Sequence, residues 1–131
     1  KDAGIPFKKQ YVAVGDLTIE GGYHMAKEVL THPEITAIFC SNDAVAIGCY
    51  RALYEAGKKV PEDISVIGFD GLPFTPSLTP ALSTGSQPIF DIGFTAAKFI
   101  VDAIEFPERR IPNKIFETKL IIRESVKTNT K

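Results

Sequence analysis

The sequence predicts an α/β fold built around a mostly parallel sheet flanked by helices. Short runs rich in β-branched residues alternate with longer segments whose apolar residues recur at helical spacing. Strand–helix–strand–helix–strand order needs crossover connections, which leave neighbouring strands parallel. With 131 residues and 44% hydrophobic residues, the chain can bury a core without disulfides or metal ions.

The first half of the chain carries two strand–helix units. Residues 11–14 (Tyr-Val-Ala-Val) predict a strand, and apolar residues at helical spacing over 19–30 predict a helix that stops before Pro33. The continuous apolar run 36–40 is typical of a strand buried in a parallel sheet. The helix after it should end at Gly57, which suits the position just past a helix C-terminus.

The second half predicts two further strands, a helix and a returning strand. Residues 64–69 form a β-branched run, and 82–86 a short polar one. The segment 72–80 holds three prolines and predicts a loop. A helix is predicted over 89–105, and a last strand over 114–123.

Several residues are candidates for the N-caps of the first two predicted helices. Asp16 and Ser41 are favoured as N-caps, because their side-chain oxygens can accept hydrogen bonds from the first turn. For Asn42 the sequence leaves capping and ligand contact equally open.

Polar residues follow each of the first four predicted strands. Parallel strands bring their carboxyl ends to one rim of the sheet, where ligands bind in such folds. Asparagine, aspartate and glutamine there offer paired donors and acceptors for a hydroxyl-rich or amide-bearing small molecule. Asp70 also fits a simple turn before Gly71, and Gln87 fits a solvated loop. The polar residues that follow these four predicted strands are Asp16, Ser41, Asn42, Asp43, Asp70 and Gln87.

No catalytic, metal or cofactor site is predicted. The sequence lacks a phosphate-binding loop, a dinucleotide fingerprint and a nucleophile elbow. His24 and His32 lie eight positions apart, without partners at metal-ligand spacing. Asp43 and Asp70 remain as the acid–base pair of an alternative reading as a small α/β enzyme.

Charge and cysteine content restrict partners and location. Fifteen basic against sixteen acidic residues give a net charge of −1, which argues against a grip on nucleic acid by this piece. No apolar run is long enough to predict a membrane partner. Cys40 and Cys49 lie in apolar runs and predict buried thiols in a reducing, cytoplasmic setting. The start without Met suggests a piece of a longer protein, and 127–131 a frayed tail.

Five stretches of the sequence, in order and correctly spaced, strongly resemble the effector-binding domain of lac-repressor-family regulators. They are Ala-Ile-Phe-Cys-Ser-Asn-Asp-Ala-Val-Ala-Ile-Gly (37–48), Val-Pro-Glu-Asp-Ile-Ser-Val-Ile-Gly-Phe-Asp (60–70), Leu-Thr-Pro-Ala-Leu-Ser-Thr (78–84), Gln-Pro (87–88) and Leu-Ile-Ile-Arg-Glu-Ser (120–125). The resemblance covers essentially the whole chain and is therefore more specific than any short motif.

The resemblance implies one lobe of a fold like that of periplasmic sugar-binding proteins, in which two Rossmann-like lobes enclose an effector. Residues 1–131 would be the C-terminal lobe with its returning segments. Segment 88–113 would pack on an N-terminal lobe that, like the DNA-binding head, lies outside this chain.

The resemblance also implies a function and its residues. The protein would be a homodimeric transcriptional regulator that senses a sugar-like effector and binds operator DNA through the absent head, without a cofactor. A periplasmic sugar-binding protein of a transporter is the alternative within the fold. The effector-contacting positions are Leu17, Asn42, Asp70 and Gln87, and the dimer positions are Ile47 and Leu78.

Overall fold

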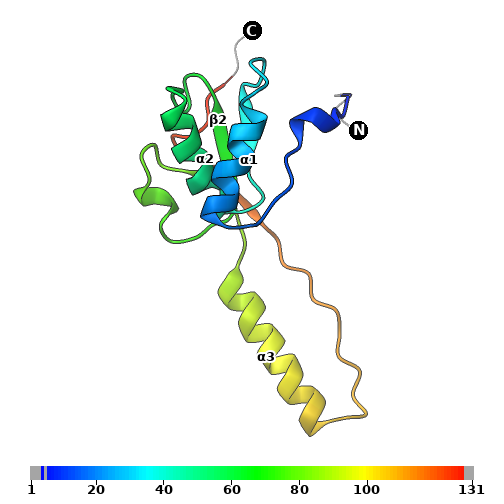
Figure 1. Cartoon of the computed structure of the whole chain (residues 1–131). Helices are drawn as coiled ribbons and strands as arrows, with labels where there is room; N and C mark the ends of the chain where they lie inside the picture. The colour runs from blue at the N-terminus through cyan, green and yellow to red at the C-terminus, as the bar shows by residue number, and fades with distance from the viewer. Residues whose placement is uncertain (1–3, 5, 129–131) are drawn as a thin grey trace.

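A computed structural model describes residue 4 and residues 6–128, and it confirms the α/β class (Figure 1). Most of the expected terminal tail, residues 129–131, lies outside the described residues. Two short 3₁₀ helices accompany the main elements, η1 (Lys9–Tyr11) and η2 (Thr75–Ser77). The main elements are α1 (Ile19–Val29), β1 (Ala37–Phe39), α2 (Asp43–Glu55), β2 (Ser65–Asp70), β3 (Ser83–Ser86), α3 (Ile89–Glu105) and β4 (Lys119–Ile121).

The four strands form one sheet in the order β1-β2-β3-β4. The first three are parallel, with Phe39 opposite Ile67 and Asp70 opposite Ser86. β4 returns antiparallel to β3. The carboxyl ends of β1, β2 and β3 therefore lie along one rim, as predicted. The expected bounds of these three strands, of α1 and of α3 are correct to within one residue.

The core lies between the sheet and the paired helices α1 and α2. Leu53 of α2, Val66 of β2 and Leu82 before β3 are fully buried. The two helices approach closely because glycines stand at their contact. A Cβ added at Gly48 would lie 1.9 Å from the carbonyl oxygen of Ile19, so the helix backbones touch directly.

The strand expected at residues 11–14 is not formed. Tyr11 closes the η1 turn, and its hydroxyl donates a 2.6 Å hydrogen bond to Glu34. The following residues leave Val12 and Val14 exposed and make no ladder with β1. A strand needs a hydrogen-bonding partner as well as β-branched residues. Here the chain is held away from the open edge of β1.

Three other local expectations are corrected by the structure. Thr18, not Asp16, caps α1 by accepting from Gly21 N–H at 3.0 Å. Asn42, not Ser41, caps α2. The last strand covers only Lys119–Ile121 within the expected 114–123, because only that part reaches β3.

The end of α2 is as expected. Gly57 follows the C-cap with φ +65°, and Lys58 N–H donates to Leu53 O at 2.9 Å. This pattern satisfies carbonyls of the last turn that have no partner within the helix.

The segment after β4 fastens the return of the chain to the sheet. The buried Ser125 hydroxyl donates to Val66 O at 2.6 Å and accepts from Ser83 N–H at 2.8 Å. Glu124 accepts from Ala81 N–H at 3.0 Å, and the Arg123 guanidinium donates to Leu82 O. These side chains therefore join the C-terminal segment to β2 and to the start of β3.

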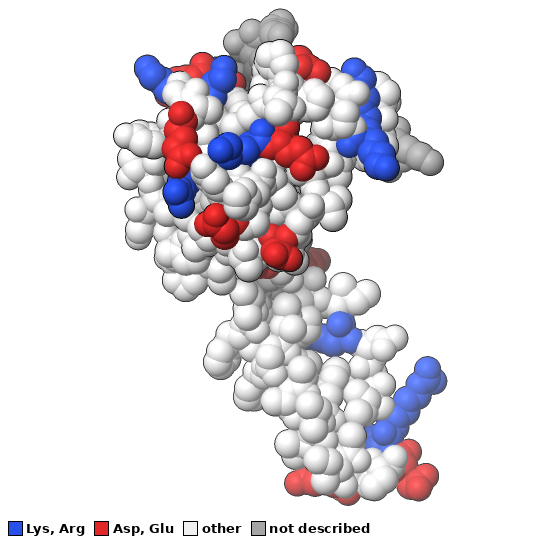
Figure 2. Space-filling view, in the orientation of Figure 1, with Lys and Arg blue, Asp and Glu red and all other residues white. Residues whose placement is uncertain are grey.

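Helix α3 projects away from the α/β body, and the segment 106–118 runs back beside it (Figure 1). None of its residues is buried, and Phe90 is 82% and Ile104 73% exposed. On the face that Figure 2 shows, charged side chains cover the body densely, whereas the arm formed by α3 and residues 106–118 is mostly uncharged apart from basic groups along one side and charges at its far end. The arm presents a broad apolar surface, because α3 exposes Ile89, Phe90, Phe94, Ile100, Val101 and Ile104.

Candidate functional site

The predicted effector residues lie at the carboxyl ends of the parallel strands or in the loop beside them. Asn42 follows β1, Asp70 ends β2 and Gln87 follows β3. Leu17 lies in the loop before α1 and is 62% exposed. The fold brings them together as two hydrogen-bonded pairs.

Asn42 and Leu17 form the first pair. The Asn42 side-chain oxygen accepts from Val45 N–H at 2.7 Å, and its nitrogen donates to Leu17 O at 3.2 Å. The capping bond therefore holds the amide in place at the start of α2. Asn42 thus fulfils the capping role that the sequence left open, and its half-buried side chain still borders the rim.

Asp70 and Gln87 form the second pair. The Asp70 carboxylate accepts from Gln87 Nε2 at 2.9 Å, and Gln87 N–H donates to Asp70 O at 3.0 Å. Asp70 has φ +110°, a conformation that few non-glycine residues adopt and that often marks functional positions. Its carboxylate keeps further lone pairs to accept from hydroxyl groups.

Asp43 plays a part that the sequence did not reveal. Its carboxylate is fully buried and accepts from Leu72 N–H at 2.8 Å and from Thr84 Oγ1 at 2.7 Å. It is therefore shielded from solvent and unlike the accessible acid or base of an enzyme. No local pattern signals these bonds, because the partners lie 29 and 41 positions further along the chain.

The two predicted dimer residues lie on adjoining elements. Ile47 is half-buried on α2, and Leu78 is half-buried in the loop after η2. The Tyr50 hydroxyl joins these elements by donating to Pro80 O at 3.2 Å. Burial raises the pKa of Tyr50 to about 12. This bond ties the helix that carries Ile47 to the loop that carries Leu78.

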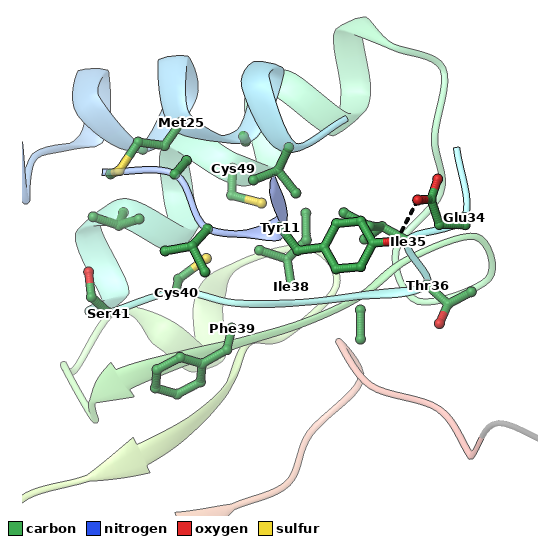
Figure 3. A pocket seen from close by; sticks show the side chains of 17 residues that line it. Tyr11, Met25, Glu34, Ile35, Thr36, Ile38, Phe39, Cys40, Ser41 and Cys49 are labelled. Atoms are coloured by element: carbon green, nitrogen blue, oxygen red, sulfur yellow. Dashed lines mark hydrogen bonds between the residues drawn. The ribbon is translucent and has the colours of Figure 1, made fainter. Parts of the chain in front are cut away.

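An apolar cavity of about 750 Å³ lies beside the rim, between β1, α1 and residues 11–13 (Figure 3). It borders the edge of β1, which stays unpaired because residues 11–14 do not form the expected strand. The hydrogen bond from Tyr11 lowers the pKa of Glu34 near one end. Cys40 and Cys49 line the cavity as free cysteines, and the neighbouring Cys49 thiol together with burial raises the pKa of Cys40. A protonated thiol is a poor nucleophile, so Cys40 is not a reactive centre.

Within residue 4 and residues 6–128, no three or more side chains of His, Cys, Asp and Glu gather into a possible metal site. Across the same described residues, every helix is too short or too polar to span a bilayer. His24 lies on the exposed surface, 3.1 Å from Glu20.

Residues 1–126 match the family model of the periplasmic binding protein-like domain. Bacterial transcriptional repressors are among the similar proteins, including the probable HTH-type transcriptional repressor ExuR of Bacillus subtilis (strain 168). It is 38% identical over 127 residues, 96% of this chain and 38% of the repressor. Regulators of the LacI family are among the solved structures that match this chain. The chain belongs to the LacI family. This LacI-family chain thus spans well under half the length of the curated relatives that it matches.

Solved LacI-family structures match the fold of this chain. A regulator from Enterococcus faecium with bound ribose is 40% identical, with a TM-score of 0.78 over 83% of this LacI-family chain and 40% of the regulator. A regulator from Arthrobacter sp. FB24 in complex with lactose is 33% identical, with a TM-score of 0.71 over 84% of this chain and 42% of that one.

Proposed function

We propose that this chain is the C-terminal lobe of the effector-binding domain of a transcriptional regulator that senses a sugar or a related small metabolite. The carrying observation is the convergence of two hydrogen-bonded pairs, Asn42 with Leu17 and Asp70 with Gln87, on one rim of a parallel sheet. Sugars bound to LacI-family relatives support this ligand class.

The rim suits a ligand with several hydroxyl groups. The Asp70 carboxylate accepts from ligand hydroxyls, and charged acceptors make the stronger and more directional hydrogen bonds. The Asn42 and Gln87 amides supply donors and acceptors beside it. Leu17 adds an apolar contact for a sugar ring face. Three of these groups are ordered by protein contacts before the ligand arrives, which lowers the entropy lost on binding.

The exposed arm supports a second part of the proposal. Residues 88–113 pack on an N-terminal lobe of the same protein, which completes the effector cleft. The apolar surface of α3, on which no residue is buried, suits such a partner. Effector binding then favours one arrangement of the two lobes, and this shift in population controls operator binding by a DNA-binding head outside this chain.

The remaining properties follow from the same role. Ile47 and Leu78 belong to a homodimer surface, and the protein works in the cytoplasm as a sensor and not as an enzyme. Ile47→Glu should weaken the dimer, because it places a charge in an apolar contact. Sedimentation that leaves the dimerisation of this variant unchanged argues against this surface.

Thermal shift of the full-length gene product with D-ribose, other monosaccharides and nucleosides tests the sensing role. We expect at least one of these compounds to raise the melting temperature in proportion to the logarithm of its concentration once it is in excess. Asp70→Asn keeps the size of the side chain and a residue type that tolerates positive φ, but removes the charge. The shift should therefore fall strongly in Asp70→Asn.

Three outcomes contradict the proposal. An undiminished shift in Asp70→Asn removes Asp70 from the site. Chemical turnover of the bound compound supports the enzyme reading instead. A signal peptide encoded upstream, in place of a helix-turn-helix, supports a transport protein.

A further inference from the structure

Asp43 places a carboxylate where ionisable groups are seldom left. Its exposed fraction is 0%, and both of its oxygens accept a hydrogen bond. Burial of a carboxylate is costly unless hydrogen bonds compensate for the lost hydration. A residue retained under that penalty needs a reason beyond filling space.

The two bonds join the three segments that carry the proposed effector residues. Asp43 directly follows Asn42 at the start of α2. Oδ2 accepts from the backbone N–H of Leu72, two residues after Asp70. Oδ1 accepts from Thr84 Oγ1 on β3, three residues before Gln87.

The surrounding backbone is shaped to admit this carboxylate. Gly68 on β2 faces it, and a Cβ at that position would lie 2.3 Å from Asp43 Oδ1. Gly68 is paired with Thr84 across the strands, so the acceptor enters beside the hydroxyl that donates to it. Two acceptor oxygens on one short side chain can serve both donors at once, whereas an alanine there would leave both without a partner.

We propose that Asp43 is the positioning residue of the effector site, and that its carboxylate fixes the spacing of Asn42, Asp70 and Gln87 without touching the ligand. This inference rests on the proposed function. Restricting these segments before binding increases affinity by lowering the cost of ordering them. Loss of the carboxylate therefore loosens the rim and weakens binding, even in molecules that remain folded.

The test compares three variants of the full-length gene product. Asp43→Ala removes both acceptors. Asp43→Asn keeps the shape, because its amide oxygen can accept from Leu72 N–H and its nitrogen can donate to Thr84 Oγ1. Leu53→Ala is the control, since Leu53 is fully buried but lies roughly 15 Å from Asp43 along α2.

The first measurement needs no ligand. Hydrogen exchange of the Leu72 and Gln87 amides reports the order of the rim, and that of Val66 reports the core. In Asp43→Ala the two rim amides should exchange at least about tenfold faster, measured relative to Val66. Asp43→Asn should stay within about threefold of the parent, and Leu53→Ala should not change this ratio. Equal acceleration of rim and core in Asp43→Ala overturns the proposal.

The second measurement uses D-ribose as the probe. Calorimetry well below the melting temperature should give a dissociation constant at least about tenfold weaker in Asp43→Ala and little changed in Asp43→Asn and Leu53→Ala. Unchanged affinity in Asp43→Ala refutes the positioning role. If the parent binds neither ribose nor any other compound in the screen, the proposed function fails, and the exchange ratio still decides whether Asp43 orders the rim.

A further variant keeps the test decisive if Asp43→Ala does not fold. Thr84→Val removes one donor while keeping the size of the side chain, and Thr84→Ser restores the hydroxyl. In Thr84→Val the exchange rate of the Gln87 amide, measured relative to that of Val66, should rise above its value in the parent. In Thr84→Ser this ratio should return to the value of the parent. No difference between these two variants overturns the proposal.

Discussion

Replacing Ser125 by alanine should destabilise the protein by about 2–4 kcal/mol. The change removes the hydroxyl that donates to Val66 O at 2.6 Å and accepts from Ser83 N–H at 2.8 Å. Each neutral hydrogen bond contributes roughly 1 kcal/mol, and a buried N–H left without an acceptor costs about 1–3 kcal/mol. Because Ser125 is fully buried, water does not readily replace the lost contacts.

Thermal melting of the full-length gene product measures this loss. Since a relative of this chain is more than twice its length, a loss of about 3 kcal/mol lowers the melting temperature of the full-length protein by roughly 4 °C. Ser77→Ala is the matched control, because Ser77 is exposed and its stability change should stay within about 0.5 kcal/mol. If Ser125→Ala melts with Ser77→Ala, the Ser125 hydroxyl does not hold the returning segment on the sheet, and the reasoning is refuted.

Three further predictions concern packing, pH and capping. Gly48→Ala should lower the free energy of unfolding by about 2 kcal/mol in urea titration, because the added methyl group meets the carbonyl of Ile19. Unchanged stability would mean that α1 and α2 can move apart at no cost. Burial raises the pKa of Tyr50 to about 12, so the neutral phenol favours the folded state and the free energy of unfolding should fall between about pH 10 and pH 12. Tyr50→Phe should lose this pH dependence, and a pH profile of stability identical to that of the parent would contradict the prediction. Asn42→Ala should lower the free energy of unfolding by about 1 kcal/mol, measured by thermal melting, because the cap of α2 is lost. Asn42→Asp keeps the cap and loses only the bond to Leu17 O, so it should lose less; an equal loss of stability in both variants would assign the effect to that bond instead.

The helices were predicted well because their signals are local. Apolar spacing within 89–105 specifies α3 without reference to the rest of the chain, and Gly57 marks the end of α2. The caps were harder, because Asp16 and Thr18 both have oxygens that can accept from a first turn. Thr18 prevails because its extended backbone (φ −112°, ψ 169°) directs its hydroxyl to the helix.

Strands depend on partners that a sequence does not display. Residues 11–14 have the composition of a strand, yet no neighbouring segment pairs with them. Residues 114–118 lie beside α3, so only 119–121 of the predicted last strand join the sheet. The rim was predictable because parallel order alone places Asp70 and Gln87 at one end. The bonds of Asp43 were not, since they depend on register across three elements.

The register of β3 and β4 has a consequence for how the arm is attached. Ser86 pairs directly with Lys119, so the chain leaves and re-enters the body at neighbouring points of an antiparallel ladder. Topologically, β3 and β4 are a hairpin into which residues 87–118 have been inserted. A two-residue Asn-Gly turn can bridge such strands, and it would restore the hairpin without disturbing their pairing. The junction at Ser86 and Lys119 is therefore the natural point at which to remove the arm while keeping the pairing of β3 with β4.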